Sequence, residues 1–556
     1  TKVKIERDFV CVNLCNGALS APYTSNLTHT RNHMNIANLF SEQAQRSPKA
    51  VAIMDTKHGR ERRMTFAELE YASASIATLL KQKGLQKGDA VLVFQTMSIE
   101  LYSVLGALFR SGLIAVFVDP SAGMKRLEQC CSLYPIKGLI ASPKAHLLRV
   151  VSSMLRNIPI KFSTGFWLPG ATTLNPARRL GSTEPVTCDA DTPALMTFTS
   201  GSTGQPKAAV RTHGFLSAQH QTLAKNLDLR GGELDVSTLP IFVLANLASG
   251  VSSLIPNADL RSPGRVKAAP IVRQILQHQP SRLSASPAFL ERLIEYCEES
   301  GEQLSSLQKI FTGGAPVFPH VLEQMSHIAP NAEIGAVYGS TEAEPIAHIA
   351  WREVETNDKQ AMMNGKGLLA GKPVTDISLR IIKDQWGRVI PNLTRATFDQ
   401  MTMPTTRVGE IVVSGEHVLR GYLNGVGDEE TKFNVDFSRW HRTGDAGYLD
   451  EQGRLWLLGR CSAKIEDEYG VLYPFAAECA VYQHRGVKRA AAVLHRGKRL
   501  LLLEPKINQR PDLAAIKNSL AWAKFVDVRL TNLAVDKRHN AKIDYGKLQA
   551  MLEKLE

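Results

Sequence analysis

The residues with the clearest chemical potential form a run of small and hydroxylated side chains directly after an apolar segment. The apolar residues 195–198 precede this run, and Lys207 follows it after a proline. In chain order, the run consists of Thr199, Ser200, Gly201, Ser202, Thr203 and Gly204. Glycines let backbone N–H groups approach a polyphosphate, hydroxyls add hydrogen-bond donors, and a lysine adds a positive charge. The run therefore predicts a loop that holds nucleotide phosphates.

This run differs from the P-loop of common ATPases. The Gly-Lys-Ser/Thr ending is absent, and Pro206 comes directly before Lys207. A cluster of serine, threonine and glycine on its own is also typical of a surface turn. The interpretation as a phosphate loop therefore depends on motifs elsewhere in the chain.

The whole string at 195–208 resembles the signature of the adenylate-forming superfamily, which includes acyl-CoA synthetases, nonribosomal-peptide adenylation domains and firefly luciferase. A second string, at 310–317, resembles the strand and turn that hold adenine in that superfamily. The resemblance implies that Gly314, Ala315 and Pro316 lie against the base.

A third string, at 337–342, resembles the second nucleotide motif of the superfamily. This match implies that Tyr338, next to Gly339, stacks on adenine. It also implies that Thr341 contacts the α-phosphate and that Glu342 binds Mg²⁺. A hard dication prefers a carboxylate and phosphate oxygens together, and it neutralises charge as pyrophosphate leaves. On its own, this string would equally fit a plain turn with a helix cap.

Two more strings complete the resemblance. Residues 440–449 resemble the Arg-Thr-Gly-Asp segment, in which Asp445 would hold both ribose hydroxyls, as a carboxylate can. Residues 453–460 resemble the strand that leads into the hinge, with Arg460 facing the ribose or phosphate. Residues 538–543 resemble the motif of the catalytic lysine, which implies that Lys542 bridges the substrate carboxylate and the α-phosphate.

The resemblance implies an ATP-dependent acid ligase that uses Mg²⁺. A carboxylic acid would attack the α-phosphorus of ATP to form an acyl-adenylate and pyrophosphate, with catalysis by positioning and electrostatics. The small domain would then rotate about its hinge to support a second reaction.

The second reaction is less well defined by the resemblance. Ser462 stands at the hinge position that is commonly aspartate in acyl-CoA synthetases, and Ala208 replaces a usual glycine. The strings at 239–248, 338–345 and 538–543 resemble one branch of the superfamily, the β-lactone synthetases of bacterial olefin biosynthesis. There the hydroxyl of a β-hydroxy acid displaces AMP without CoA, and an intramolecular nucleophile is entropically favoured. Three hypotheses stay open: β-lactone formation, transfer to the thiol of CoA or an acyl-carrier protein, and an inactive nucleotide-binding homologue.

The resemblance also predicts an acyl pocket. It implies that Ile241, Phe242, Asn246 and the segment 284–287 lie against the acyl group. Their apolar character favours a fatty or β-hydroxy fatty acid over an amino acid. The alternative is that these residues belong only to the core.

The pattern of strands and helices predicts the scaffold that positions these motifs. Strand-like runs at 89–94 and 114–118 flank a helix-like segment at 99–110, which indicates a parallel sheet covered by helices. The segment 409–414 and its turns favour short antiparallel strands. We therefore predict an α/β fold with an N-terminal extension at 1–34 and a large AMP-binding domain at 35–459. That domain has parallel-sheet subdomains and a β-barrel-like part, and a hinge leads to a small, mobile α+β domain at 460–556.

Composition narrows the classes of function. A chain of 556 residues is too long for one ordinary core, and its net charge of +13 permits anionic ligands such as ATP and CoA. The basic clusters lack the aromatic interleaving of a nucleic-acid module, so we expect no nucleic-acid partner. The apolar stretch 101–118 contains Arg110, so we expect no transmembrane segment. The eight cysteines lack the spacing of a zinc site and are few for a chain of this length, which favours the reducing cytoplasm. The Gly-x-Ser-x-Gly string of a hydrolase is absent.

Overall fold

The computed structural model describes residues 34–119, 123–175, 181, 183–200, 206–535 and 542–554. The predicted N-terminal extension, apart from residue 34, therefore lies outside the described residues. The same is true of Gly201, Ser202, Thr203 and Gly204, and of the side chains of Thr199 and Ser200. Among the described helices, none combines the length and apolarity that a bilayer crossing requires.

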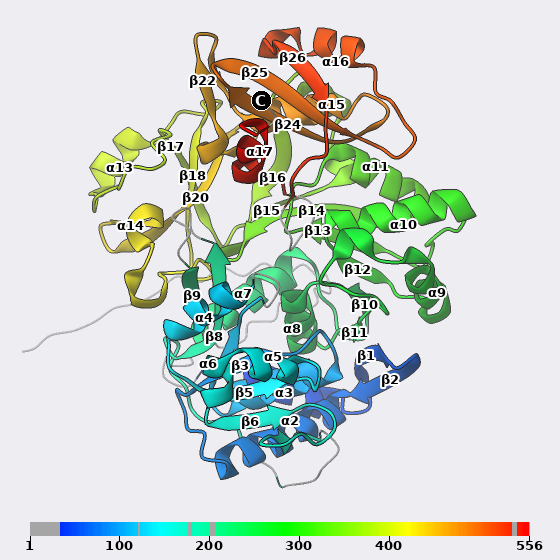
Figure 1. Ribbon diagram of the computed structural model, residues 1–556, viewed down its shortest axis with the longest axis vertical. Helices are drawn as coiled ribbons and strands as arrows, with labels where there is room; N and C mark the ends of the chain where they lie inside the picture. Colours follow the sequence, from blue (N-terminus) through cyan, green and yellow to red (C-terminus); the bar gives the residue numbers. More distant parts are fainter. Residues whose placement is uncertain are drawn as a thin grey trace, which may run out of the picture.

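A seven-stranded sheet forms one end of the molecule (Figure 1). Its strand order is β7-β6-β5-β3-β4-β8-β9, and every pairing is parallel except that of β8 with β9. The strands are β3 (Ala90–Phe94), β4 (Ile114–Phe117), β5 (Ile136–Ala141), β6 (Ile160–Ser163), β7 (Thr172–Thr173), β8 (Pro193–Ser200) and β9 (Pro206–Thr212). The helices of this part are α2 (Phe66–Gln82), α3 (Ile99–Arg110), α4 (Met124–Ser132), α5 (Leu148–Val151) and α6 (Ser153–Asn157).

The predicted strand–helix–strand unit is β3–α3–β4. All five residues of β3 are buried, as expected for a parallel strand covered on both faces. All residues of α3 are buried as well. The helix shares one apolar cluster with β3, with Ile53 of strand β1 (Val51–Lys57) and with Val243 of helix α8 (Pro240–Ser249), and the latter two elements belong to the second sheet and its helices. Helix α3 thus joins the two sheets.

The second sheet has fourteen strands and runs through the rest of the large body. Its order is β17-β18-β20-β21-β16-β15-β14-β13-β12-β10-β11-β1-β2, and β19 pairs with β20. In chain order, its first seven strands are β1 (Val51–Lys57), β2 (Arg60–Thr65), β10 (Leu234–Ser237), β11 (Ser252–Leu254), β12 (Arg282–Ala285), β13 (Lys309–Gly313) and β14 (Glu333–Ser340). Those that follow are β15 (Ala343–Ala350), β16 (Leu368–Pro373), β17 (Ser378–Ile382), β18 (Gly409–Ser414), β19 (Lys432–Val435), β20 (Ser438–Leu449) and β21 (Leu455–Arg460).

The pairing of this sheet changes at β14. From β1 through β11, β10, β12 and β13 to β14 the strands are parallel, whereas β14 pairs antiparallel with β15. The antiparallel strands beyond it form the part predicted as barrel-like. The remaining helices of the large body are α1 (Ala37–Arg46), α7 (His213–Asn226), α8 (Pro240–Ser249), α9 (Ala268–His278), α10 (Pro287–Ser300), α11 (Pro319–Ile328), α12 (Thr356–Met363), α13 (Arg395–Met401) and α14 (Asp428–Thr431).

A buried ion pair ties the antiparallel strands together. Arg442 of β20 is 1% exposed, and its Nη2 donates to Oε2 of Glu410 in β18 over 2.6 Å. Its Nη1 donates to the backbone oxygen of Arg388, and its guanidinium lies over the ring of Trp386. These contacts satisfy both charges, which a fully buried pair requires.

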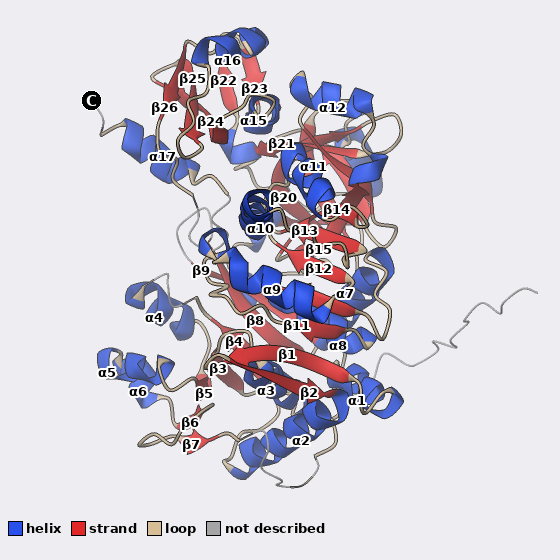
Figure 2. Ribbon diagram, turned by 90° about the vertical axis from the view of Figure 1, so that its right-hand side faces the viewer, coloured by secondary structure: helices blue, strands red, loops and turns tan. Residues whose placement is uncertain are grey.

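The small C-terminal domain lies beyond β21, at the opposite end from the seven-stranded sheet (Figures 1 and 2). The chain reaches it through a short 3₁₀ turn, Cys461–Ala463, in which Ser462 is exposed. Its elements are β22 (Ile465–Asp467), β23 (Gly470–Leu472), α15 (Pro474–Val481), β24 (Val487–His495), β25 (Lys498–Pro505), α16 (Leu513–Ser519), β26 (Asp527–Leu530) and α17 (Tyr545–Leu552). This mixture of antiparallel and parallel strands with helices matches the predicted α+β composition.

Aromatic side chains form the contact between the two domains. Tyr482, which follows α15, lies 4.5 Å from the rings of both Phe318 and His320 at the start of α11. Phe475 of α15 packs against Phe318 at 6.0 Å. Burial, together with the nearby charge of Lys506, lowers the pKa of His320 to about 4. The imidazole in this contact is therefore neutral at pH 7.

Acidification should weaken this domain contact through His320. The pKa of His320 is depressed from 6.5, so its contribution is fully present above pH 6.5 and is lost as the pH falls toward 4. The full loss corresponds to roughly 3 kcal/mol. We expect small-angle scattering to detect domain separation in the wild type at about pH 5, and less separation in His320→Phe, which keeps the aromatic stack without a titrating group.

The matched control is His327→Phe, because His327 lies exposed on the same helix, α11. This variant should follow the wild-type pH profile. Identical profiles for the wild type and His320→Phe would show that His320 does not govern the contact.

Candidate active site

The turn that connects β14 to β15 forms the centre of the site. Tyr338, Gly339 and Ser340 end β14, and Thr341 and Glu342 make the turn before β15 begins. No helix follows this turn, so the alternative of a helix cap is wrong here. The turn lies at the carboxyl end of the parallel strands, which is where ligands bind in open α/β sheets.

Glycines let the backbone pack closely at this edge. A Cβ atom on Gly313 would lie 2.6 Å from the oxygen of Val337, and one on Gly339 would lie 3.0 Å from the oxygen of Ala343. Gly314 has a φ of +81°, a conformation that favours glycine. The turn predicted to hold adenine, at Gly314, Ala315 and Pro316, is thus held directly beside the end of β14.

Three of the predicted nucleotide residues contact one another. The hydroxyl of Tyr338 donates to Oδ2 of Asp445 over 2.8 Å, and Nε of Arg460 lies 3.2 Å from Oδ1. Asp445 and Arg460 are register partners in β20 and β21, which explains their proximity. Burial and the Asp445 carboxylate raise the pKa of Tyr338, so the phenol stays protonated. A carboxylate offers about four acceptor positions, so Asp445 can accept further hydrogen bonds from a ligand.

Glu342 contacts residues that the sequence motifs did not identify. The hydroxyl of Tyr422 donates to Oε1 of Glu342 over 2.8 Å. The buried ammonium of Lys432 donates to the oxygen of Leu419, whose own N–H donates to the oxygen of Glu342. Burial lowers the pKa of Lys432 to about 7, although Glu342 opposes this shift. The Gly-Tyr pair at 421–422, seven residues after the end of β18, is the sequence signal that could have indicated this contact.

The arrangement around Glu342 is compatible with Mg²⁺ but supplies few protein ligands. Among the described residues, no group of three or more His, Cys, Asp or Glu side chains could hold a metal ion. Mg²⁺ is usually bound by one or two carboxylates together with substrate phosphates. Glu342 therefore fits as a single carboxylate ligand that acts only with a bound polyphosphate.

Lys207, the lysine of the predicted phosphate loop, has an acidic partner. It is the second residue of β9, opposite Thr199 in β8, and its Nζ lies 2.7 Å from Oε2 of Glu430 in α14. Gly427 makes room for it, since a Cβ atom there would lie 2.4 Å from the Lys207 side chain. A polyphosphate that binds Lys207 must therefore compete with Glu430.

A cavity of about 2980 Å³ connects three of the predicted nucleotide residues with the C-terminal lysine. Its lining includes Gly314, Gly339, Thr341 and Lys542. Nη2 of Arg211 donates to the oxygen of Thr341 over 3.0 Å and so ties β9 to the turn. The structure thus brings the predicted catalytic lysine and the predicted α-phosphate ligand to one cavity.

The segment that carries Lys542 is anchored to the small domain. Ile543 forms a β-bridge with Val535, and Tyr545 donates to the carboxylate of Glu478 in α15. Glu478 is buried, and this burial raises its pKa to about 7. Movement of the small domain would therefore carry Lys542 with it.

Helix α8 provides an apolar wall of the same cavity. Ile241 and Phe242, two of the residues predicted to contact the acyl group, both line it. Asn246 does not: it is 1% exposed and donates to Oδ2 of Asp235 over 2.7 Å and to Ser253 over 3.1 Å. Asn246 lies one helical turn after Phe242, and both side chains are buried. The amide of Asn246 thus has structural partners, and its predicted substrate contact stays a prediction. Within 284–287, Ser286 lines the cavity.

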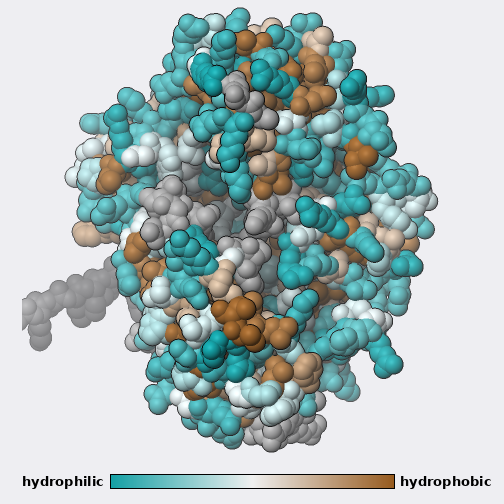
Figure 3. All heavy atoms as spheres, viewed as in Figure 1, coloured by the Kyte–Doolittle hydropathy of each residue, from teal (hydrophilic) through white to brown (hydrophobic). Residues whose placement is uncertain are grey.

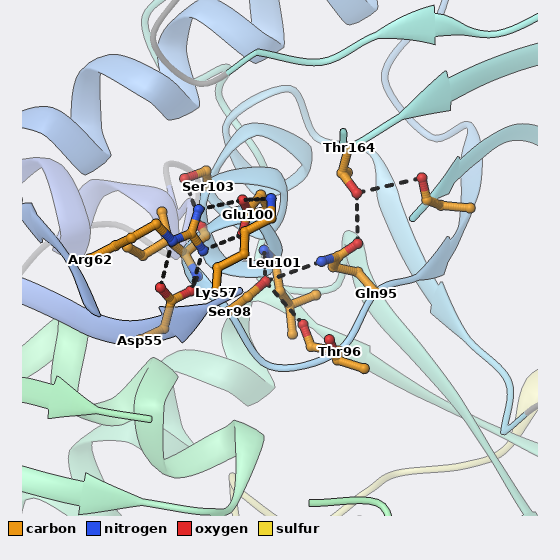
Figure 4. Close-up of polar contacts among 12 residues, drawn as sticks. Asp55, Lys57, Arg62, Gln95, Thr96, Ser98, Glu100, Leu101, Ser103 and Thr164 are labelled. Carbon is orange, nitrogen blue, oxygen red and sulfur yellow. Dashed lines mark hydrogen bonds and ion pairs between the residues drawn. The ribbon is translucent and has the colours of Figure 1, made fainter. Parts of the chain in front are cut away.

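The outer part of the cavity is bordered by an ion network that sequence analysis missed (Figure 4). Arg62 of β2 binds Asp55 at 2.5 Å and Glu100 at 2.7 Å, and Lys57 binds Glu100 at 2.8 Å. Burial raises the pKa of Glu100, but hydrogen bonds from Arg62 and Lys57 outweigh it and bring the value to about 2. These four charges balance, and they hold the β1–β2 hairpin against the start of α3.

Sequence comparison identifies relatives along nearly the whole chain. A family model described as AMP-binding enzyme matches residues 40–423. The chain is 30% identical to an olefin β-lactone synthetase of Stenotrophomonas maltophilia, covering 92% of this chain and 97% of the relative. It is 30% identical to an olefin β-lactone synthetase of Xanthomonas campestris, with coverages of 87% and 90%. It is 28% identical to a 2-succinylbenzoate–CoA ligase of Bacillus velezensis, with coverages of 82% and 84%.

Solved structures share the fold. The anthranilate CoA ligase AuaEII in complex with anthranoyl-AMP superposes with a TM-score of 0.79 at 17% identity, covering 94% of this chain and 98% of that chain. ATP-bound MatB from Rhodopseudomonas palustris gives a TM-score of 0.74 at 20% identity, with coverages of 94% and 100%. The predicted α/β fold with a smaller C-terminal domain is confirmed.

Replacing Glu430 should change nucleotide affinity through Lys207. In Glu430→Gln the lysine loses its charged partner, so a polyphosphate no longer competes with a carboxylate. Because Glu430 is partly exposed, we expect a gain of up to about 1 kcal/mol, or roughly fivefold tighter ATP binding by calorimetry. Lys207→Ala should weaken binding instead.

The matched control is Glu416→Gln, because Glu416 lies 3.6 Å from Arg420 at the surface and not beside Lys207. Its ATP affinity should equal that of the wild type. Weaker binding by Glu430→Gln would mean that Glu430 supports nucleotide binding and does not compete with it.

Proposed function

The chain belongs to the AMP-binding enzyme family and is an adenylate-forming acid ligase, and from this premise we propose that it activates a fatty or β-hydroxy fatty acid and closes the adenylate to a β-lactone. The observation that carries the proposal is the shared cavity. Thr341 and Lys542 lie at its polar end, and Ile241 and Phe242 line its apolar wall. A molecule with a carboxylate head and an aliphatic tail is complementary to such a cavity.

The nucleotide occupies the polar end in this proposal. Asp445 accepts hydrogen bonds from the ribose hydroxyls, while Tyr338 and Arg460 hold its carboxylate in place. Gly314, Ala315 and Pro316 lie against the adenine, beside Tyr338 and Gly339. The loop from Thr199 to Gly204 and Lys207 contact the phosphates. Mg²⁺, when bound through Glu342, offsets phosphate charge.

Adenylation then proceeds by displacement at the α-phosphorus. A carboxylate oxygen of the acid forms a bond to this phosphorus, and the bond to the bridging oxygen breaks, so that pyrophosphate leaves. Lys542 offsets the negative charge of the carboxylate and the α-phosphate as they approach, and Thr341 donates to an α-phosphate oxygen. Both act as preorganised donors, for which removal typically costs about a hundredfold to a thousandfold in rate.

The second step is an intramolecular displacement. The β-hydroxyl oxygen bonds to the acyl carbon, the acyl–phosphate bond breaks, and the products are a β-lactone, AMP and one proton. Two features support this choice over a thioester. The two olefin β-lactone synthetases match the chain along most of both lengths, and Ser462 occupies the exposed turn at the predicted hinge.

Transfer to the thiol of CoA or of a carrier protein is the second candidate. The similarity to a 2-succinylbenzoate–CoA ligase, which covers 82% of the chain, supports it. In that reaction the thiol sulfur bonds to the acyl carbon and AMP leaves, so adenylation is common to both candidates.

Lys542→Ala should abolish adenylation. We expect acid-dependent exchange of labelled pyrophosphate into ATP to fall at least about a hundredfold, because one preorganised charge is lost at the α-phosphate. Lys547→Ala is the matched control: Lys547 lies on α17, is 62% exposed and pairs with Asp544. Exchange at the wild-type rate in folded Lys542→Ala would remove Lys542 from the mechanism.

Product analysis should separate the two second steps. Incubation with ATP, Mg²⁺ and a long-chain β-hydroxy acid is expected to yield the β-lactone by mass spectrometry, at the same rate with and without CoA. A fatty acid without the β-hydroxyl should stop at the acyl-adenylate, which controls for the nucleophile. Formation of a thioester in place of the β-lactone when CoA is present would favour the second candidate.

A further inference from the structure

Five large apolar side chains gather on the surface near α5. Leu147, Val150, Val151, Phe166 and Trp167 are each between 67% and 71% exposed, and we call them the α5 patch. Figure 3 shows a continuous hydrophobic area on this part of the molecule. Isolated exposed apolar residues are common, but a contiguous group indicates an interaction site.

Local contacts hold the two segments of the α5 patch side by side. Nη1 of Arg149 donates to the oxygen of Pro169 over 3.3 Å, which joins α5 to the segment after β6. Ser163 donates to the oxygen of Phe166 over 3.0 Å and fixes the turn that presents the aromatic pair. These two hydrogen bonds therefore hold the side chains of the α5 patch in a defined arrangement.

The α5 patch is continuous with the cavity of the active site. Leu147 and Phe166 line the same cavity as Ile241 and Lys542. Val151 and Trp167 belong to the patch but do not appear in that lining. An aliphatic chain held at the patch would therefore be at the entrance of the cavity.

The charge around the α5 patch is mostly positive, although the carboxylate of Glu128 accepts a hydrogen bond from Ser152, directly after α5, over 3.1 Å. Residues 129–183 contain seven Lys or Arg residues and no Asp or Glu. Lys144 and Arg156 are exposed next to the patch. Apolar side chains with a Trp, bordered by cations, are the combination that binds the interface of an anionic bilayer. Each nearby cation contributes about 1 kcal/mol to such binding.

We propose that the α5 patch docks the protein on an anionic lipid surface, with Val151 and Trp167 inserted among the headgroups and the cavity entrance facing the lipid. A fatty acid can then pass from the bilayer into the cavity. The docking itself is independent of the proposed function. Only the delivery of a fatty acid rests on the proposed function.

Co-sedimentation of the full chain with vesicles tests the docking. We expect binding to vesicles of phosphatidylcholine mixed with phosphatidylglycerol, and much weaker binding to phosphatidylcholine alone. Added salt should weaken the binding, because it screens the cations. In Val151→Ser/Trp167→Ser we expect affinity to fall at least about tenfold, since two inserted apolar side chains are lost. Equal binding by this variant and the wild type would overturn the proposal.

The control variant is Phe437→Ser. Phe437 is fully exposed on the turn between β19 and β20, outside the α5 patch, so its replacement should leave vesicle binding unchanged. An equal loss in this variant would point to nonspecific adsorption and overturn the proposal. A wild-type dimer that Val151→Ser/Trp167→Ser dissociates, without vesicle binding, would also overturn it in favour of a second copy as the occupant.

Catalysis with a short, water-soluble acid separates this proposal from the proposed function. Pyrophosphate exchange with that acid should be unaffected by Val151→Ser/Trp167→Ser, because neither residue lines the cavity. With a long-chain acid embedded in vesicles, the variant should be several-fold slower than the wild type. Equal rates on embedded acid would overturn the delivery step, whereas no exchange with any acid would overturn the proposed function and leave the docking intact.

Discussion

The change from parallel to antiparallel pairing at β14 is the constraint on which the site depends. The parallel strands end together at one edge, and the tight turn after Ser340 sends the chain back along β14. Glycines at 313 and 339 allow this close approach, since a side chain would collide with neighbouring backbone. The antiparallel strands that continue the sheet then bring Asp445 and Arg460 to Tyr338. Tyr338, Asp445 and Arg460 are thus positioned by strand register.

Each charged group of the site already has a protein partner. Asp445 is held by Tyr338 and Arg460, Glu342 by Tyr422, and Lys207 by Glu430. Such pairing orients the side chains before a ligand arrives, which lowers the cost of organising them. In the proposed nucleotide complex, polyphosphate would compete with Glu430 for Lys207, whereas the ribose would add hydrogen bonds to the Asp445 carboxylate, which is already oriented. The proposed ligand would therefore displace a protein partner at the phosphate end of the nucleotide and keep the existing contacts at the ribose end.

The cavity extends from the small domain to the surface near α5. One space extends from Lys542, past the apolar wall of α8, to the surface at Leu147 and Phe166. The lysine belongs to a segment anchored on Glu478 of the small domain, and that domain contacts the large one through His320, Phe318 and Tyr482. A rotation of the small domain would open this end of the cavity, while the entrance near α5 belongs to the large domain and would stay in place.

The sequence by itself determined the superfamily, the parallel and antiparallel segments, and the order of the nucleotide motifs, because these depend on local periodicity and on residue types at fixed spacing. The helix predicted at 99–110 coincides with α3, and the strands at 90–94 and 114–117 match the prediction closely. Only the tertiary structure decided which side chains meet. Tyr422, Lys432 and Glu430 approach Glu342 and Lys207 from distant positions, and no local pattern records such contacts. The contacts of Asn246 with Asp235 and Ser253 likewise depend on how α8 packs against the sheet, and this packing is a property of the whole fold.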